Sequence, residues 1–190
     1  MAAFSLIELL FALGVAATLA STGVAQLTMS VDGVRAAGAA RHLTSRLQQA
    51  RVRAVTRNRS TALRITRDAG GYVVSVHEDG TNNGVLAADI QSGTDPQVGP
   101  VERLPDQFPG VEFGTLPGVP GAEGSLAPGT DPIRLGVSDS VTFTPTGTAT
   151  PGSLYVLSRG RRQLVVRIYG ETGRTRVLEY NARTRVWRGR

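Results

Sequence analysis

The sequence predicts an α+β protein in which one long N-terminal helix packs on an antiparallel β-sheet head domain. Three observations predict this fold. Residues 4–29 form an apolar run of helical length, and residues 30–58 continue the helical period as an amphipathic extension. From residue 60 to residue 190 the period changes to two, in short segments separated by Gly-containing turns. A chain of 190 residues then leaves room for a single head domain with its own core.

The apolar run, FSLIELLFALGVAATLASTGVAQLTM, has the length of a membrane-spanning segment. At about 1.5 Å of rise per residue, some 20 apolar residues cross a hydrocarbon layer about 30 Å thick. We therefore expect a single transmembrane helix over residues 4–29. Glu8 is its one ionisable residue. A carboxylate in such a segment costs free energy unless it finds a cation, so Glu8 is a candidate functional residue.

The first residues of this run resemble the prepilin signature. Phe4-Ser5-Leu6-Ile7-Glu8-Leu9-Leu10 has a Phe at the expected cleavage point and a Glu four residues later. The resemblance implies that a prepilin peptidase cuts between Ala3 and Phe4, that residues 1–3 are the remnant of a leader, and that Phe4 is then N-methylated. Ala3 stands where the signature usually has Gly. The resemblance also implies that Glu8 pairs with the N-terminal ammonium of a neighbouring subunit during assembly.

The amphipathic extension should be the part of the helix that the head covers. Leu43, Leu47, Ala50 and Ala54 form one apolar stripe at helical spacing, and arginines occupy the other faces. We expect this stripe to pack on the sheet. Gly33 and Gly38 weaken the helix by up to about 1 kcal/mol each relative to Ala, which would allow a bend between the two halves. One long helix on a β domain is the type IV pilin-like architecture that the N-terminal signature implies.

The head should begin with a hairpin and continue with a long loop. TALRITR, the turn Asp68-Ala69-Gly70-Gly71 and YVVSVH have the alternation and turn residues of two paired strands. Residues 78–140 are rich in Gly, Pro and Asp, and we expect a loop there with at most short strands near residues 111–113 and 133–137. Its carboxylates lack a calcium-loop spacing, which favours a solvated loop.

Composition argues against several classes of chemistry. The chain has no Cys, and its two histidines, His42 and His77, lie far apart in sequence. No catalytic triad, phosphate-binding loop or dinucleotide fingerprint is present. We therefore expect no metal, no cofactor and no enzymatic activity. The net charge of +6 is unevenly distributed, since the acids gather between residues 68 and 139 and the arginines on either side.

The last third of the chain carries the second resemblance. SVTFTPTGTA, SLYVLSRG and QLVVRIYGETGRTRVLEY, followed by RTRVW, alternate as strands. The order of a T-F-x-P-x-G element, an R-G-R-R turn and a strand near E-T-G-R resembles the C-terminal half of the GspH/FimT domain. That family implies a minor pseudopilin or minor pilin in the bacterial inner membrane, with its head in the periplasm. Its partners would be the prepilin peptidase and other pilin subunits of a type II secretion pseudopilus or a type IV pilus.

A second hypothesis concerns DNA. Gly173-Arg174-Thr175-Arg176 resembles the GRxR motif of FimT-type members, which implies DNA binding during natural transformation. If residues 174–180 form a strand, Arg174 and Arg176 point to one face and can engage phosphates. Further arginines in nearby turns could join them: Arg159, Arg161, Arg162, Arg183, Arg185, Arg188 and Arg190. The alternative is that these arginines form a solvated sheet face or pair with the acidic residues 78–140.

Overall fold

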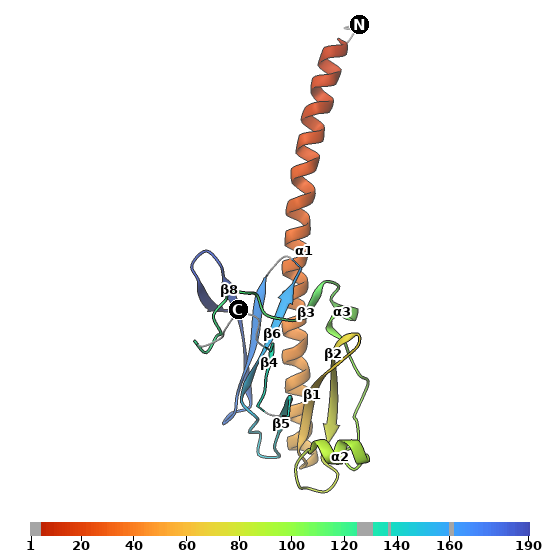
Figure 1. The fold of residues 1–190 in the computed structure, drawn as a ribbon, viewed down its shortest axis with the longest axis vertical. Coiled ribbons are helices and arrows are strands. Elements are labelled where there is room, and N and C mark those ends of the chain that lie inside the picture. The colour runs from red at the N-terminus through yellow and green to blue at the C-terminus, as the bar shows by residue number, and fades with distance from the viewer. Residues whose placement is uncertain (1–4, 125–130, 137, 160–161) are drawn as a thin grey trace.

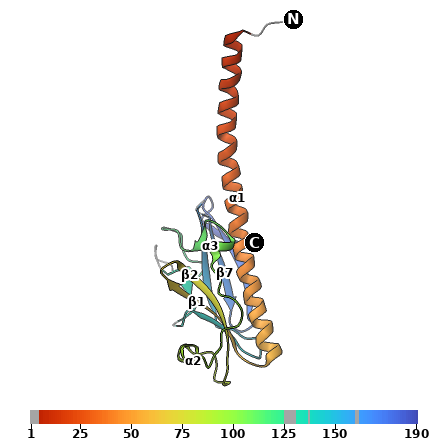
Figure 2. The same ribbon diagram turned by 90° about the vertical axis from the view of Figure 1, so that its right-hand side faces the viewer.

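One helix organises the whole molecule. The computed structural model describes residues 5–124, 131–136, 138–159 and 162–190, and the side chains of all of these except residues 20–29. Helix α1 (Leu6–Arg57) is continuous from the N-terminal end to the far end of the head, as Figures 1 and 2 show. It ends at Asn58, which has the left-handed backbone conformation that Asn tolerates at such ends.

The head contains two antiparallel sheets. The first has the order β2-β1-β5, from β1 (Thr61–Asp68), β2 (Gly71–Glu78) and β5 (Ser140–Phe143). The second has the order β3-β6-β7-β8-β9, and β4 also pairs with β6. Its strands are β3 (Val111–Phe113), β4 (Ile133–Arg134), β6 (Gly152–Ser158), β7 (Gln163–Tyr169), β8 (Arg174–Asn181) and β9 (Val186–Gly189). The predicted hairpin and C-terminal strands are confirmed.

The second half of α1 packs along one side of both sheets (Figure 2). Leu43, Leu47, Ala50 and Ala54 are all buried, which confirms the predicted stripe. The stripe meets the inward-facing apolar residues of both sheets in one core, whose sheet members include Leu63, Val141, Phe143, Leu154, Leu164 and Val166. Alternating residues on β6 and β7 supply this core because successive side chains on a strand point to opposite faces.

The two glycines leave α1 unbroken, because the chain remains helical through both positions. The glycines instead admit neighbours. A Cβ atom on Gly38 would lie 2.9 Å from the Phe108 ring, and one on Gly33 would lie 2.8 Å from the Arg162 guanidinium. The Phe108 ring explains the glycine at position 38, whereas the Arg162 guanidinium is the end of a flexible side chain that can shift away from position 33.

The described residues between 78 and 140 contain more regular secondary structure than the predicted loop. They contain β3, β4 and two short helices, α2 (Ala87–Ser92) and α3 (Leu104–Gln107), which the sequence did not predict. Residue pairs Val74–Glu102 and His77–Gln97 also form isolated antiparallel bridges with β2. Leu104, Val111, Phe113, Ile133 and Leu135 from this segment are buried. These apolar residues anchor the segment in the core, although its Gly and Pro content had indicated a loop.

The first half of α1 extends away from the head (Figure 1). Its apolar side chains between residues 6 and 19 are exposed; Leu6, Phe11 and Leu19 retain 79%, 75% and 67% of their accessible surface. Among helices in the described part of the chain, none combines the length and mean hydropathy needed to cross a membrane.

Candidate functional site

The bare half of α1 carries one charged residue among its described side chains. Glu8 lies in the first turn, is exposed, and forms no ion pair with any described residue. A carboxylate in the first turn of a helix is favoured by the helix dipole, by about 0.3–1 kcal/mol at an exposed site. The helix dipole explains why Glu8 is tolerated at the start of the helix. It does not explain why a carboxylate lies among apolar residues. Ala3 and Phe4, the predicted cleavage and methylation residues, lie outside the described residues.

The second candidate site is on the side of β7 and β8 that faces away from α1. The Thr175 hydroxyl accepts a hydrogen bond of 3.4 Å from Gln48 on α1, so its neighbours Arg174 and Arg176 point outward. Both are exposed, and neither guanidinium has a hydrogen bond or ion pair with a described residue. The prediction that these two arginines share one face of a strand is confirmed.

Strand register adds a third arginine that the sequence analysis missed. Arg176 is directly opposite Arg167 on β7, and Arg174 is opposite Tyr169. The Arg167 guanidinium lies 5.6 Å from the centre of the Tyr169 ring, and its Nη2 lies 3.9 Å from Glu123. Alternation along QLVVRIY could have placed Arg167 on a polar face, but only the register places it beside Arg176. We call Arg167, Arg174 and Arg176 the outer-face arginines.

Gly173, the first residue of the GRxR match, has a structural role. Its φ is +59°, and a Cβ atom there would lie 2.4 Å from the carbonyl oxygen of Gly147. Arg51 also donates a hydrogen bond of 3.1 Å to that oxygen. The glycine is therefore required by the turn between β7 and β8, whatever the two arginines bind.

The remaining predicted arginines are not gathered around Arg174. Arg183 and Arg185 lie in the turn between β8 and β9, at the opposite end of β8 from Arg174. Arg162 lies against α1 at Gly33, and its Nη1 is 3.1 Å from Glu179. Arg161 lies outside the described residues. A strand of eight residues spans about 26 Å, so the structure divides the predicted cluster between two ends of the sheet.

Residues 114–124 cover part of the outward-facing side of the second sheet. The Tyr155 hydroxyl accepts a hydrogen bond of 3.1 Å from the Ala122 amide, and burial raises the pKa of this phenol above its usual value. Trp187 packs on Tyr180 and donates its indole N–H to the Pro120 carbonyl oxygen. The two aromatic rings are therefore in contact with each other, and the indole N–H is already used within the head.

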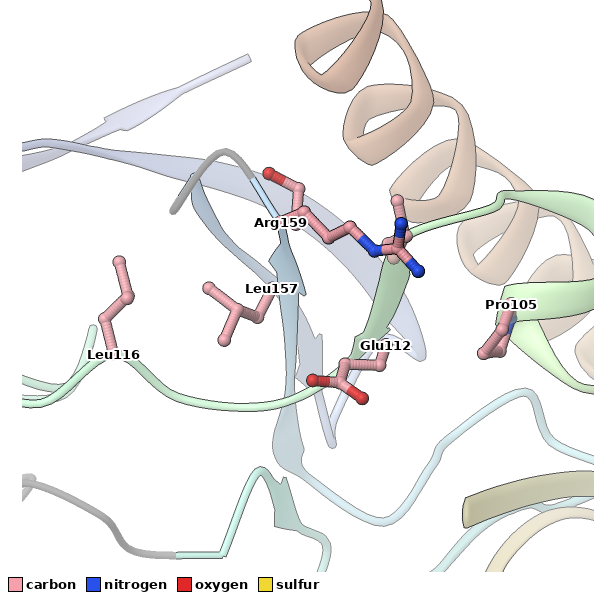
Figure 3. A pocket seen from close by; sticks show the side chains of 8 residues that line it. Pro105, Glu112, Leu116, Leu157 and Arg159 are labelled. Carbon is pink, nitrogen blue, oxygen red and sulfur yellow. The ribbon is translucent and has the colours of Figure 1, made fainter. Parts of the chain in front are cut away.

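Arg159 lines a cleft beside β3 (Figure 3). The cleft has a volume of about 330 Å³, and Pro105, Glu112, Leu116 and Leu157 lie around it. The Arg159 amide donates to the Gly110 carbonyl oxygen at 2.9 Å. The walls present one carboxylate and one guanidinium among apolar surfaces, and no catalytic pair of residues.

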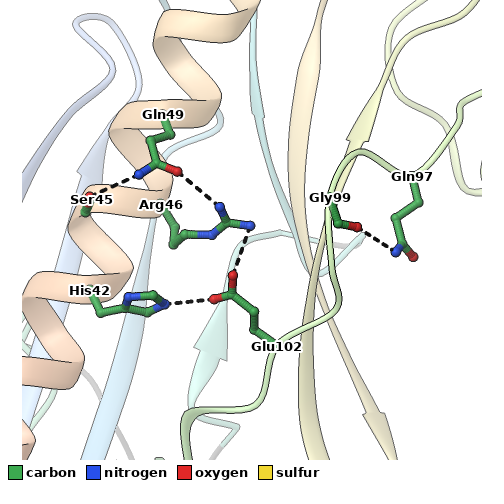
Figure 4. A network of polar contacts seen from close by, with 7 residues as sticks. All are labelled: His42, Ser45, Arg46, Gln49, Gln97, Gly99 and Glu102. Atoms are coloured by element: carbon green, nitrogen blue, oxygen red, sulfur yellow. Dashed lines mark hydrogen bonds and ion pairs between the residues drawn. The ribbon is translucent and has the colours of Figure 1, made fainter. Parts of the chain in front are cut away.

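A polar network ties the long segment to α1 (Figure 4). One Glu102 carboxylate oxygen is 2.8 Å from His42 Nε2, and the other is 3.3 Å from Arg46 Nη2. Arg46 also donates to Gln49 at 3.1 Å. Glu102 keeps only 17% of its side-chain exposure. The network joins α1 to the edge of the first sheet, and its position between packed elements indicates a structural role.

Two buried carboxylates hold the segment after β2. Asp79 accepts hydrogen bonds from the amides of Thr81, Asn82 and Gly84, and Asp95 accepts from those of Gly80 and Leu86. These oxygens are used by the backbone. Among the described residues, no three His, Asp or Glu side chains are grouped so that they could hold a metal ion.

The arrangement defines a class of protein. A single helix with one half buried in an antiparallel sheet head and the other half bare is the architecture of a pilin-like subunit. The family model for the type II transport protein GspH matches residues 39–172, which is more than half of the chain. The chain therefore belongs to the GspH family, a family of structural pseudopilins and not a known class of enzyme.

A solved structure, the minor pseudopilin EpsH from the type 2 secretion system of Vibrio cholerae, is similar to this chain. It is 17% identical, with a TM-score of 0.47, and the match covers 76% of this chain and 97% of that chain. No curated protein matches the sequence. The family match ends at residue 172, immediately before Gly173 and the outer-face arginines of β8.

Proposed function

We propose that this chain is a minor pseudopilin subunit that assembles into a type II secretion pseudopilus through the bare half of α1. One observation carries this proposal: the head buries the helix from about residue 33 onward and leaves the apolar side chains before residue 20 exposed. In water such a surface is costly, at about 25 cal/mol for each Å². A membrane, and then the helices of neighbouring subunits, would cover it.

Glu8 has a specific role in this proposal. After cleavage between Ala3 and Phe4, the new ammonium group of one subunit would meet the Glu8 carboxylate of the next. An ion pair in an apolar surrounding is strongly destabilised when one partner is removed, by about 3–5 kcal/mol. Glu8 would therefore select the axial position of each subunit, while the apolar side chains around it supply the attraction.

The test is cross-linking of the chain to other pseudopilins in secreting cells, combined with mass spectrometry of its N-terminus. Glu8→Gln should reduce cross-linked assemblies at least tenfold and leave membrane insertion unchanged. Ser5→Ala, in the same turn, is the matched control and should assemble normally. Assembled material that retains Met1 would contradict the cleavage step, and normal assembly of Glu8→Gln would contradict the role of its charge.

A second candidate function is DNA binding by the outer-face arginines. It is favoured by the exposure of Arg174 and Arg176 and by the absence of any described carboxylate paired with them. Three guanidinium groups without base-reading side chains would contact phosphates, so binding should be weak, independent of base sequence and strongly salt-dependent. Arg174→Gln plus Arg176→Gln should reduce the slope of log K against log salt by about two.

Fluorescence anisotropy of a labelled duplex with the full chain in detergent, at about 50 and 200 mM salt, measures that slope. Arg57→Gln plus Arg59→Gln, at the far end of α1, removes the same charge and is the control. Absence of binding at the lower salt would eliminate this second function and leave the proposal of a pseudopilin intact.

A further inference from the structure

The end of the head nearest the bare half of α1 is unusually rich in arginine. Three elements meet there: α1 itself, the turn between β6 and β7, and the hairpin of β8 and β9, whose turn is at the same end in Figure 1. We call seven arginines at this end the arginine collar: Arg35, Arg159, Arg162, Arg183, Arg185, Arg188 and Arg190.

Contacts place the collar at the level of α1 where the head begins. The Arg162 guanidinium lies over Gly33, and Arg35 donates to the Pro109 carbonyl oxygen at 3.5 Å. Glu179 is paired with both Arg162 and Arg190. Arg188 is opposite Glu179 on β9, and the β8–β9 turn continues beyond it in the same direction. Glu179 thus neutralises part of the collar. Asp32 on α1 and Glu112 beside Arg159 also lie at this end, and the seven arginines outnumber these three carboxylates.

The distance between the collar and the apolar run is short. Met29 is the last residue of that run, and Gly33 is four residues later on the same continuous helix, which corresponds to about 6 Å along its axis. An arginine side chain is longer than this, and electrostatic screening at physiological salt acts over about 8 Å. If the apolar run is embedded, as the proposed function requires, the collar therefore lies at the level of the lipid headgroups.

The β8–β9 turn supplies independent support. Arg185 has a φ of +54°, a backbone conformation that Gly and Asn adopt with less strain. Asn181 shapes the turn by accepting hydrogen bonds of 3.0 Å from the amides of Arg183 and Thr184. Arg185 is exposed and combines this backbone conformation with no hydrogen bond or ion pair to a described residue, so packing does not explain it. The strand register places Arg183 and Arg185 in a turn at the end of the head from which α1 emerges.

We propose that the arginine collar binds the phosphates of anionic phospholipids, and so holds the head against the membrane surface before the subunit enters a filament. This inference rests on the proposed membrane insertion of α1. Guanidinium groups match phosphate geometry, and charges near an anionic surface add to one another. Because the collar is built by folding, from residues as distant in sequence as Arg35 and Arg190, it can form only after the head has folded on the far side of the membrane.

The test uses the full chain in nanodiscs of zwitterionic lipid, or of the same lipid with about 30% phosphatidylglycerol. Trp187, the single tryptophan, is two residues from Arg185, so energy transfer from Trp187 to dansyl-labelled headgroups reports how close the turn is to the surface. We expect greater transfer in the anionic nanodiscs at about 50 mM salt, and loss of the difference at about 500 mM.

Arg183→Gln plus Arg185→Gly is the decisive variant. Glycine relieves the strain at position 185, so this variant should melt at least as high as the parent chain. Each arginine at an anionic surface changes the ratio of docked to free heads about fivefold, and the pair about 25-fold, which should abolish most of the lipid-dependent transfer. The control Arg57→Gln plus Arg174→Gln removes the same charge outside the collar and should retain the lipid-dependent energy transfer.

The outcomes separate this inference from the proposed function. If the chain inserts into both kinds of nanodisc and energy transfer from Trp187 is equal in the two, the proposed lipid binding by the collar is wrong and the pseudopilin proposal stands. A chain that resists insertion into either overturns both. If the decisive variant keeps its lipid response and instead loses binding to a duplex oligonucleotide, the collar is a nucleic-acid surface and the lipid proposal is wrong.

Discussion

The two halves of α1 have the same secondary structure and opposite surroundings. Between residues 6 and 19 the apolar side chains are exposed on every side, whereas Leu43 and Leu47 in the second half are 1% and 0% exposed. Apolar residues surround the helix in the first half and form a stripe in the second. The comparison teaches that the stripe is matched to a sheet within the same chain, while an all-round apolar surface needs partners outside it.

The largest predicted effect comes from placing a charge in the covered half. Leu47→Asp would bury a carboxylate in the core and remove a packed side chain, at a cost of at least about 4 kcal/mol. Leu10→Asp makes the same chemical change in the bare half and should leave unfolding of the head unchanged. Urea unfolding in detergent, followed by Trp187 fluorescence, measures both. Equal midpoints for the two variants would refute the division.

A second test compares two glutamates. Glu102→Ala leaves His42 and Arg46 without their shared carboxylate at a largely buried position, and should cost about 2 kcal/mol. Glu8→Ala should leave the stability of the head unchanged, because Glu8 contacts nothing in the head. The same unfolding assay applies. A Glu102→Ala variant as stable as the parent would show that the network in Figure 4 adds nothing to the packing of the long segment.

The two helical glycines Gly38 and Gly14 sharpen the comparison. Alanine gains up to about 1 kcal/mol of helix propensity at either position. At Gly38 the new methyl group would press on the Phe108 ring, and overpacking costs about 1–3 kcal/mol, so the net effect should be a loss of about 1 kcal/mol. Gly14 has no atom within 4 Å of a new Cβ, so Gly14→Ala should be harmless. Thermal melting would distinguish them, and a stabilised Gly38→Ala would show that Phe108 moves freely.

The smallest predicted effect tests whether the stability of the head is independent of substitutions in the bare half of α1. Burial, and then the nearby Asp131, raise the pKa of Asp139. Its ionised form therefore costs stability above the folded pKa, and the cost disappears as the pH falls through that value. Asp139→Asn should stabilise the head by a few tenths of a kcal/mol at pH 7, after allowance for solvent screening, and by nothing near pH 3. The gain should be identical in a Leu10→Asp background.

Some features of the candidate sites could be predicted from the periodicity of the sequence, and others depend on tertiary contacts. The outward direction of Arg174 and Arg176 could be predicted because a strand alternates, and the stripe of Leu43 and Leu47 because a helix repeats every 3.6 residues. The pairing of Arg176 with Arg167 could not, since strand register depends on how two distant segments meet. The position of Arg162 on the side of the sheet that faces α1, beside Glu179, could not be predicted for the same reason.

The sequence by itself determined the long helix, its division into an all-round apolar half and a striped half, the hairpin and the C-terminal strands, because each follows from a period that the residues carry locally. Only the tertiary structure decided how the described residues between 78 and 140 pack, why Gly38 is a glycine, and which arginines are neighbours. Those features depend on atoms brought together from distant parts of the chain, such as Phe108 against Gly38 and Arg162 against Gly33. Local periodicity contains no information about such contacts.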